Sequence, residues 1–253
     1  YAGAGPYPQC FEMDDVQKIN SANLKKINFL NQSVKFIDLI SPSFYMPFAG
    51  TYILGGKLSS LNKYRGIPEL DEAIGFIDNE LKHNKVESKG VLLNSYKSFD
   101  INNPVLEDFI PVQQVKRDEY LKFISNKMFD YEEQIIPDKK EIIDLLESSY
   151  KNFDNKRKDL NVESKTKIAI NVFDHFAMFN FKGDPIEYIS KNELDKLDNI
   201  IIYNLDERLL FNILRGPRFA HWNNAEIGSH INFERRPNNY DRNIYYCMNF
   251  FHS

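Results

Sequence analysis

The sequence predicts an α+β protein built from two domains. In the first domain, residues 1–95, helix-like segments surround a short apolar strand and a glycine-containing loop, which is an α/β pattern. In the second domain, residues 114–253, two helical segments come first and a small set of strands follows, with one helix inserted. Helices and strands segregated in this way are typical of α+β domains. The irregular segment 95–113 is the predicted boundary.

Composition limits the classes of protein to consider. The chain has 253 residues, of which 42% are hydrophobic and 27% are charged, so it can bury a core. A formal net charge of -4 argues against nucleic acid as the main partner. No apolar run approaches the ~20 residues that a membrane-spanning helix needs. The two cysteines, Cys10 and Cys247, make no disulfide framework and favour a reducing, cytoplasmic location.

A long helix and a buried strand are expected early in the first domain. The helix is predicted over residues 14–39, where apolar residues recur at helical spacing until Pro42 ends it. These apolar residues are Val16, Ile19, Leu24, Ile27, Leu30, Val34 and Ile37. The strand is predicted at residues 44–46, covered on both faces, with a turn at 47–50. Ligands bind beyond the carboxyl ends of such strands, so residues 47–56 are one candidate site, with a plain tight turn as the alternative.

Shorter elements complete the first domain. Residues 57–64 predict a short polar helix, and Pro68 begins a second helix. The apolar face of that second helix comprises Leu70, Ile74, Ile77 and Leu81. Residues 91–93 are a short strand candidate.

The second domain opens with helices over residues 114–129 and 138–159. Asp138 is the predicted N-cap of the longer helix. The apolar side of that helix comprises Ile142, Leu145, Leu146, Tyr150 and Phe153. Residues 166–173 alternate between apolar and polar side chains and predict a strand, and residues 176–181 predict a second. The short link between the two strands indicates a hairpin.

The remaining elements are shorter. Residues 199–203 predict a third strand, and Asp206 is expected to cap a helix over residues 207–214. A turn region rich in polar and aromatic residues follows. A last strand is predicted near residues 231–234, before an aromatic tail at 245–251.

The segment 215–236 concentrates the side chains suited to ligand binding. Its four arginines are suited to clamping a phosphate or carboxylate, its tryptophan to stacking, and its adjacent amides to orienting a ligand. The predicted binding residues are Arg215, Arg218, His221, Trp222, Asn223 and Asn224, with Arg235 and Arg236 completing the arginine set. The alternative is a hairpin whose amides satisfy the turn and whose arginines are solvated.

The sequence identifies no catalytic residue and no metal ligand. His-x-His, His-Glu-x-x-His and Cys-x-x-Cys spacings are absent, and nine positions separate His221 from His230. There is no Gly-x-Ser-x-Gly motif, and Cys10 has no visible base partner. Each histidine is therefore expected to be structural or solvated.

Three motifs together resemble a known family. They are A-G-A-G-P-Y-P-Q-C-F (residues 2–11), S-P-S-F-Y-M-P-F-A-G (41–50) and R-G-P-R-F-A-H-W-N-N-A-E-I-G-S-H (215–230). The sequence resembles the metallo-β-lactamase-fold portion and C-terminal region of CMP-N-acetylneuraminate hydroxylase and its bacterial relatives. The resemblance implies an αβ/βα sandwich with a metal site at one edge. It places residues 2–8, including Tyr7, at the rim of that site as a substrate-binding loop.

The sequence also departs from that family. The superfamily's His-x-His-x-Asp-His motif is missing, so the chain is expected to be the C-terminal part of a longer protein, inactive alone. Zinc or iron ligands would then come from the missing N-terminal half, which is the expected partner. Phe48 and Ala49 stand where the resemblance implies a histidine ligand. Residues 166–233 faintly resemble the sterol-carrier-like fold, which implies a small apolar or substrate-covering module.

Two hypotheses about function follow from the sequence. In the first, residues 1–95 are the C-terminal part of a metallo-β-lactamase-like domain, and residues 114–253 are an α+β C-terminal domain. The protein would then belong to a metal-dependent hydrolase or hydroxylase-related enzyme acting on a nucleotide-activated or surface sugar. The alternative is a non-catalytic binding or docking module for an anionic sugar or lipid ligand.

Overall fold

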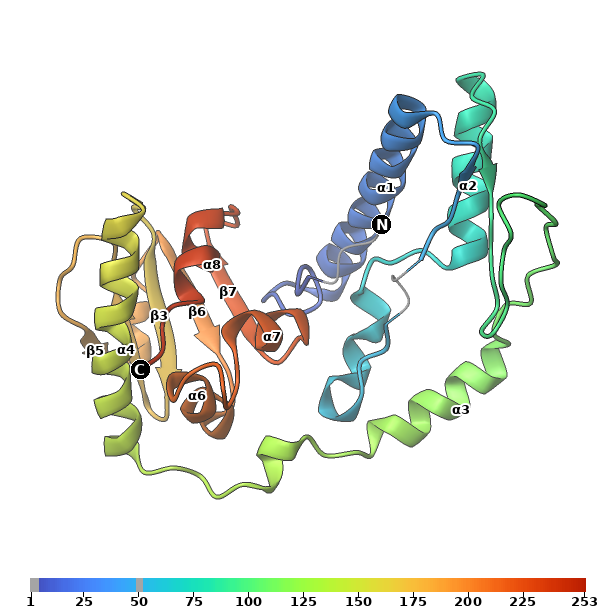
Figure 1. Cartoon of the computed structure of the whole chain (residues 1–253). Helices are drawn as coiled ribbons and strands as arrows, with labels where there is room; N and C mark the ends of the chain where they lie inside the picture. The colour runs from blue at the N-terminus through green and yellow to red at the C-terminus, as the bar shows by residue number, and fades with distance from the viewer. Residues whose placement is uncertain (1–4, 49–51) are drawn as a thin grey trace. The chain divides into compact units, whose positions relative to one another are not determined.

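The structure is a computed structural model that describes residues 5–48 and 52–253 (Figure 1). It combines helices with a mixed sheet and a small parallel strand pair, which confirms the predicted α+β class. The expectations for residues 2–4 and 49–50 lie outside the described residues.

The chain divides into two compact units. The first unit comprises residues 1–9 and 13–127, and the second unit comprises residues 10–12 and 128–253. The division falls after the segment 95–113, so the helix that begins at residue 114 belongs to the first unit.

The first unit is mainly helical. Its elements are α1 (Asp15–Ile40), β1 (Phe44–Tyr45), the 3-10 helix η1 (Gly56–Tyr64), α2 (Leu70–His83), β2 (Lys89–Gly90) and α3 (Gln114–Ser125). Asp14 caps α1, because its side chain accepts a hydrogen bond from the backbone N–H of Gln17. Arg117 of α3 donates from its two terminal guanidinium nitrogens to the two carboxylate oxygens of Glu69, the residue before α2.

The core of the first unit lies between α1 and α2, which run side by side in Figure 1. Its buried residues are Leu30, Val34 and Ile37 from α1 and Ala73, Ile77 and Leu81 from α2. The predicted apolar face of α1 is only partly buried, since Val16 and Leu24 are 68% and 60% exposed. The reason is length: α1 has 26 residues, and the 14 residues of α2 cover one part of it.

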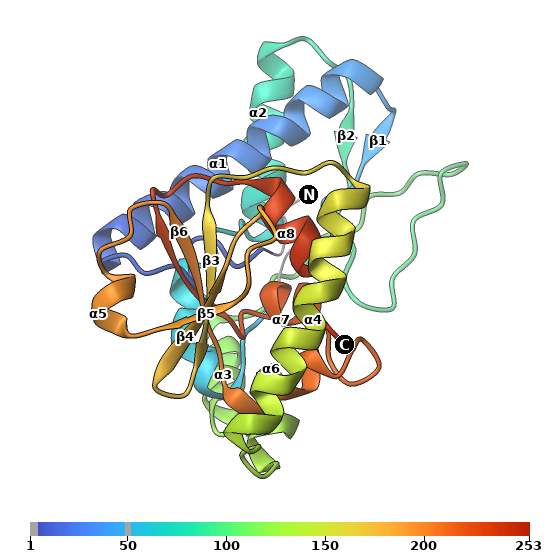
Figure 2. The ribbon, with the colours of Figure 1, turned by 90° about the vertical axis from the view of Figure 1, so that its left-hand side faces the viewer.

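A strand is confirmed at residues 44–45, but its predicted burial on both faces is wrong. Strand β1 has two residues, both half-buried, and Met46 is 41% exposed. It pairs in parallel with β2, Phe44 opposite Lys89, and the two strands run side by side in Figure 2. The strand expected at 91–93 therefore lies at 89–90 instead. Tyr45 packs against the α1–α2 core and Phe44 against Phe99, so each residue of β1 is partly covered rather than fully buried.

The second unit carries the sheet. Its elements are η2 (Asp130–Glu133), α4 (Lys139–Asp159), β3 (Lys167–Val172), β4 (His175–Phe179), β5 (Glu187–Ile189), α5 (Lys191–Leu194), β6 (Ile200–Asn204), α6 (Glu207–Leu214), α7 (Trp222–Ile227), β7 (Asn232–Arg236) and α8 (Arg242–Met248). The predicted N-caps Asp138 and Asp206 are confirmed, since each accepts a backbone N–H at the start of its helix. Helix α7 replaces the turn expected from the sequence.

The sheet has five strands in the order β5-β4-β3-β6-β7. The β3–β4 hairpin is confirmed, with Val172 opposite His175, and β3 pairs in parallel with β6. The other neighbouring strands are antiparallel. Residues 10–12 extend the sheet, because Phe233 of β7 exchanges backbone hydrogen bonds with Cys10 and Glu12, both 2.7 Å long. This short segment covers the open edge of β7.

Aromatic rings fill the space between the sheet and the helices on one of its faces. The ring contacts are Phe153 of α4 to Phe179, Trp222 of α7 to Tyr203, and Tyr245 of α8 to Phe233, with centroids 5.2, 5.8 and 6.2 Å apart. Figures 1 and 2 show α4 running along the sheet. On the opposite face, Leu194 of α5 packs in a smaller cluster with Ala169, Met178, Ile200 and Ile202.

The aromatic core should determine the stability of the second unit. Phe153 is fully buried and contacts Phe179, Phe181 and Phe251. We expect Phe153→Ala to lower the free energy of unfolding by about 3–5 kcal/mol, because the cavity it leaves cannot be refilled by its rigid neighbours. Urea denaturation of the whole chain, followed by the fluorescence of Trp222, measures the loss.

The matched control is Phe219→Ala, in the same unit at a position that is 50% exposed. It should change the free energy of unfolding by less than about 1 kcal/mol. Equal losses in the two variants would contradict the placement of the core.

Candidate functional site

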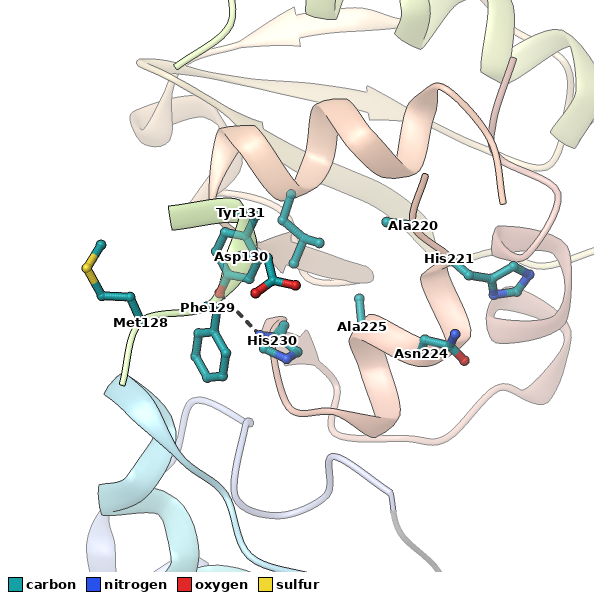
Figure 3. Close-up of a pocket in the computed structure, with 10 residues that line it drawn as sticks. Met128, Phe129, Asp130, Tyr131, Ala220, His221, Asn224, Ala225 and His230 are labelled. Carbon is teal, nitrogen blue, oxygen red and sulfur yellow. Dashed lines mark hydrogen bonds between the residues drawn. The ribbon is translucent and has the colours of Figure 1, made fainter. Parts of the chain in front are cut away.

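A pocket in the second unit is the candidate functional site (Figure 3). Its volume is about 360 Å³, within the range of small-molecule sites. It is lined by Met128, Phe129, Asp130, Tyr131, Leu209, Ala220, His221, Asn224, Ala225 and His230. These residues come from the segment around η2, from α6, and from α7 with its flanking turns.

One wall of the pocket is the segment that leads into η2. The backbone N–H of Phe129 donates to the side chain of Glu132 at 2.8 Å, which closes this turn. Arg208 of α6 then anchors the segment by donating to the backbone carbonyl of Glu132 at 2.6 Å. The same guanidinium donates to the carboxylate of Asp206 at 2.7 Å. The N-cap residue of α6 therefore also fixes the position of the pocket wall.

The opposite wall is α7. His221 caps this helix, because its Nδ1 accepts the backbone N–H of Asn223 at 3.1 Å. A tight turn after α7 brings His230 next to the helix. The backbone N–H of His230 donates to the backbone carbonyl of Ala225 at 2.8 Å. Gly228 is required there, since an added Cβ would lie 2.8 Å from His230 Cδ2 and 2.9 Å from the carbonyl oxygen of Asn224. That oxygen belongs to the helix backbone and cannot move aside.

Three rings meet at one end of the pocket. The hydroxyl of Tyr131 lies 3.2 Å from Nδ1 of His230, the contact dashed in Figure 3. The ring of Phe129 stacks on that of Tyr131, with centroids 5.7 Å apart. It also makes an edge-to-face contact with the ring of His230, with centroids 4.6 Å apart. These contacts hold the three side chains in one orientation, and pre-oriented groups bind a ligand at lower entropic cost.

The polar groups of the pocket lie at two ends. Figure 3 shows Asp130 near Tyr131 and His230 at one end, while His221 and Asn224 lie toward the other. Ala220 and Ala225 are small, apolar lining residues of the same pocket. This arrangement can accept hydrogen bonds through Asp130 and exchange them through imidazole and amide groups.

The structure places two of the predicted binding residues, His221 and Asn224, in the pocket lining. Asn223 is exposed on α7 and is not part of that lining. Arg215 lies over the ring of Phe219, with its guanidinium carbon 3.8 Å from the ring centroid. Arg218 is exposed in the turn that leads to His221.

Trp222 is a core residue rather than the exposed stacking surface expected from the sequence. It is 3% exposed, and its ring lies edge-on to Tyr203 and Phe251. Its indole N–H donates to the backbone carbonyl of Phe251 at 2.6 Å. The apolar ring and its single donor are therefore both used within the fold.

The other predicted residues have separate positions. Arg235 of β7 donates to Tyr245 at 3.2 Å and to Asn238, and Arg236 donates to the carbonyl of Leu194 at 3.0 Å. Successive residues of a strand point to opposite faces, so these two arginines cannot converge on one ligand. Tyr7 belongs to the first unit, where its hydroxyl donates to Ser21 at 3.2 Å.

The sequence did not indicate Phe129, Asp130 or Tyr131 as site residues. Phe129 ends the predicted helix over residues 114–129, whereas α3 ends at Ser125 in the structure, and Asp130 and Tyr131 lie between that helix and the next with no motif of their own. The signal that could have found them is compositional: two aromatic residues flank an aspartate at the end of that predicted helix. His230 was recognised only as part of the polar segment that includes His221.

The comparisons with known proteins name no relative. No protein family, curated protein or solved structure matches this chain. Within residues 5–48 and 52–253, no group of three or more His, Cys, Asp or Glu side chains is placed to hold a metal ion. No helix in the same part of the chain has the length and apolar character to cross a bilayer.

Substitution of Trp222 measures how much its buried hydrogen bond contributes to the free energy of unfolding. We expect Trp222→Phe to lower the free energy of unfolding by at least about 1–3 kcal/mol, because the carbonyl of Phe251 loses its donor in a dry core. Circular dichroism in urea is the suitable measurement, since the variant lacks the only tryptophan.

Asn223→Ala, one residue along the same helix but exposed, is the control. Its free energy of unfolding should lie within about 0.5 kcal/mol of that of the natural protein. A Trp222→Phe variant as stable as the control would contradict the structural role of the indole.

Proposed function

We propose that the second unit is a binding module for a small sugar-type ligand, held in the pocket between η2 and α7. The observation that supports this most directly is the pairing of rigid rings with polar groups around one cavity of about 360 Å³. A sugar ring has apolar faces and a rim of hydroxyls, so it suits a site of this composition. Of the two hypotheses, this is the binding alternative.

The polar groups match the hydrogen-bonding capacity of a sugar. The carboxylate of Asp130 is an acceptor for hydroxyl donors, and the amide of Asn224 both donates and accepts. The imidazoles of His221 and His230 add further donors or acceptors. The rings of Phe129 and Tyr131 offer the apolar contact that a sugar face requires.

An anionic substituent on the sugar is the second part of the proposal. Arg218 is exposed and lies three residues before His221, which Figure 3 shows toward the end of the pocket away from Asp130. A guanidinium at this end would attract a carboxylate or phosphate, while Asp130 would repel one at the other end. The ligand would therefore bind with its acidic group toward Arg218.

The enzymatic hypothesis, a metal-dependent protein of the metallo-β-lactamase fold acting on a nucleotide-activated sugar, rests on the sequence resemblance alone. The proposal made here rests on the pocket. It requires no metal and no reaction, and it is tested by binding.

Isothermal titration calorimetry with N-acetylneuraminic acid tests the pocket. We expect Asn224→Ala to weaken binding by about 1–1.5 kcal/mol, roughly tenfold, because one hydrogen-bonding group at the ligand is lost. Asn223→Ala is the matched control, since the neighbouring amide lies outside the pocket lining. No binding to the natural protein, or equal effects of the two substitutions, would refute the proposed site.

Arg218→Ala tests the acidic substituent. We expect it to weaken binding of N-acetylneuraminic acid by about 1.5–3 kcal/mol, the range for a hydrogen bond to a charged group. Binding of the neutral sugar N-acetylglucosamine should be unchanged. An equal loss for both sugars would show that Arg218 does not contact an anionic group.

A further inference from the structure

Residues 10–12 belong to the second unit, although the residues before and after them in the chain belong to the first. The segment lies along β7, where the backbone N–H of Phe233 donates to the carbonyl of Cys10 and the N–H of Glu12 donates to the carbonyl of Phe233, each at 2.7 Å. The rings of Phe11 and Phe233 stack with centroids 5.1 Å apart. Cys10 and Phe11 are each 3% exposed, so docking of the segment buries two apolar side chains.

The same segment contacts the turn that carries His230. The thiol of Cys10 donates to the backbone carbonyl of Ser229, the residue before His230, at 3.5 Å. Ser229 is 2% exposed and has a φ of 65°, in the left-handed region that residues with a side chain rarely adopt. A residue keeps such a conformation only where its surroundings hold it there, and Cys10 is part of those surroundings.

The other contacts of this turn are with the pocket. The backbone N–H groups of Ser229 and His230 donate to carbonyls in the last turn of α7, at 3.0 and 2.8 Å. His230 lines the pocket, and its ring makes edge-to-face contacts with Phe129 and Tyr131, with centroids 4.6 and 5.6 Å away. Adjacent residues of one tightly bonded turn therefore contact the segment 10–12 and the pocket wall.

We propose that docking of residues 10–12 on β7 and ligand binding in the pocket stabilise each other through the turn at residues 228–231. Two backbone hydrogen bonds hold the segment, so it opens more easily than the central strands of the sheet. When it leaves, Ser229 loses the contact of Cys10, the turn relaxes, and His230 leaves its place among the rings of the pocket. This regulation of binding rests on the proposed function, whereas the link between the segment and the pocket wall does not.

The thiol of Cys10 reports whether the segment is docked, and Cys247 is an internal control. Cys247 lies in α8 and is 0% exposed. Alkylation of the folded full chain with iodoacetamide, followed by mass spectrometry of the two cysteine peptides, gives a separate rate for each thiol. We expect Cys10 to react faster than Cys247, because its segment opens without unfolding of the core. Equal rates would show that the segment opens only with the whole unit and would overturn the proposal.

Phe129→Ala tests the link without any ligand. We expect it to raise the alkylation rate of Cys10 by about threefold or more, because the ring of His230 loses a contact and the turn loosens. Phe219→Ala, at an exposed position of the same unit, is the control and should leave the rate unchanged. An unchanged rate for Cys10 in Phe129→Ala, or an equal rise for Cys247, would contradict the link.

Ligand binding is tested with N-acetylneuraminic acid. At saturation it should slow the alkylation of Cys10 by about threefold or more and leave Cys247 unchanged, since linkage acts in both directions. Conversely, Phe11→Ala should weaken binding of this sugar by at least about threefold, although Phe11 does not line the pocket. Tyr188→Ala, in β5 at the opposite edge of the sheet, should bind as the natural protein does. Phe11→Leu, which also lacks the stacked ring, serves if the alanine variant does not fold.

The two proposals fail in different ways. If the sugar does not bind the natural protein while Phe129→Ala speeds the alkylation of Cys10, the proposed function fails and the link stands. If the sugar binds but does not slow this alkylation, or binds Phe11→Ala as tightly as the natural protein, the pocket stands and its coupling to residues 10–12 is refuted.

Discussion

The hydrogen bond from the indole of Trp222 to the carbonyl of Phe251 is the contact on which the candidate site depends. Helix α7 has six residues, which is too short to be stable by its own backbone hydrogen bonds. Its position is therefore set by tertiary contacts, among them those of the buried ring of Trp222 with Tyr203 and Phe251. The ring of Phe251 in turn stacks on that of Phe179 in β4, with centroids 4.8 Å apart. Phe251 therefore links α7 to the sheet.

The two sides of this short helix face different surroundings, the pocket and the sheet. One side of α7 presents small and polar residues to a cavity, and the other places the ring of Trp222 against Tyr203 of the sheet. The two sides are linked mechanically, because a rigid helix cannot turn one face without moving the other.

Helix periodicity alone did not show which parts of a predicted face are covered. The apolar spacing of α1 is regular from Val16 to Ile37, yet the described structure buries its later part and exposes much of the earlier one. Burial requires a partner helix, and α2 extends along only part of α1. The same limitation applies to Trp222, whose neighbours Arg218 and Asn223 suggested an exposed binding face. Residues that are adjacent in the sequence point in different directions on a helix, so they need not share one environment.

The sequence by itself determined the elements whose signals are local. Asp138 and Asp206 predicted their helix starts because an N-cap needs only the next turn of chain, and the alternation in β3 predicted its strand because the two faces of a strand repeat every second residue. Only the tertiary structure decided the pocket. Tyr131 and His230 are 99 residues apart, and their contact depends on how η2 and α7 dock on a common core. No local sequence pattern predicts this contact, because it is set by the packing of elements that are far apart in the sequence.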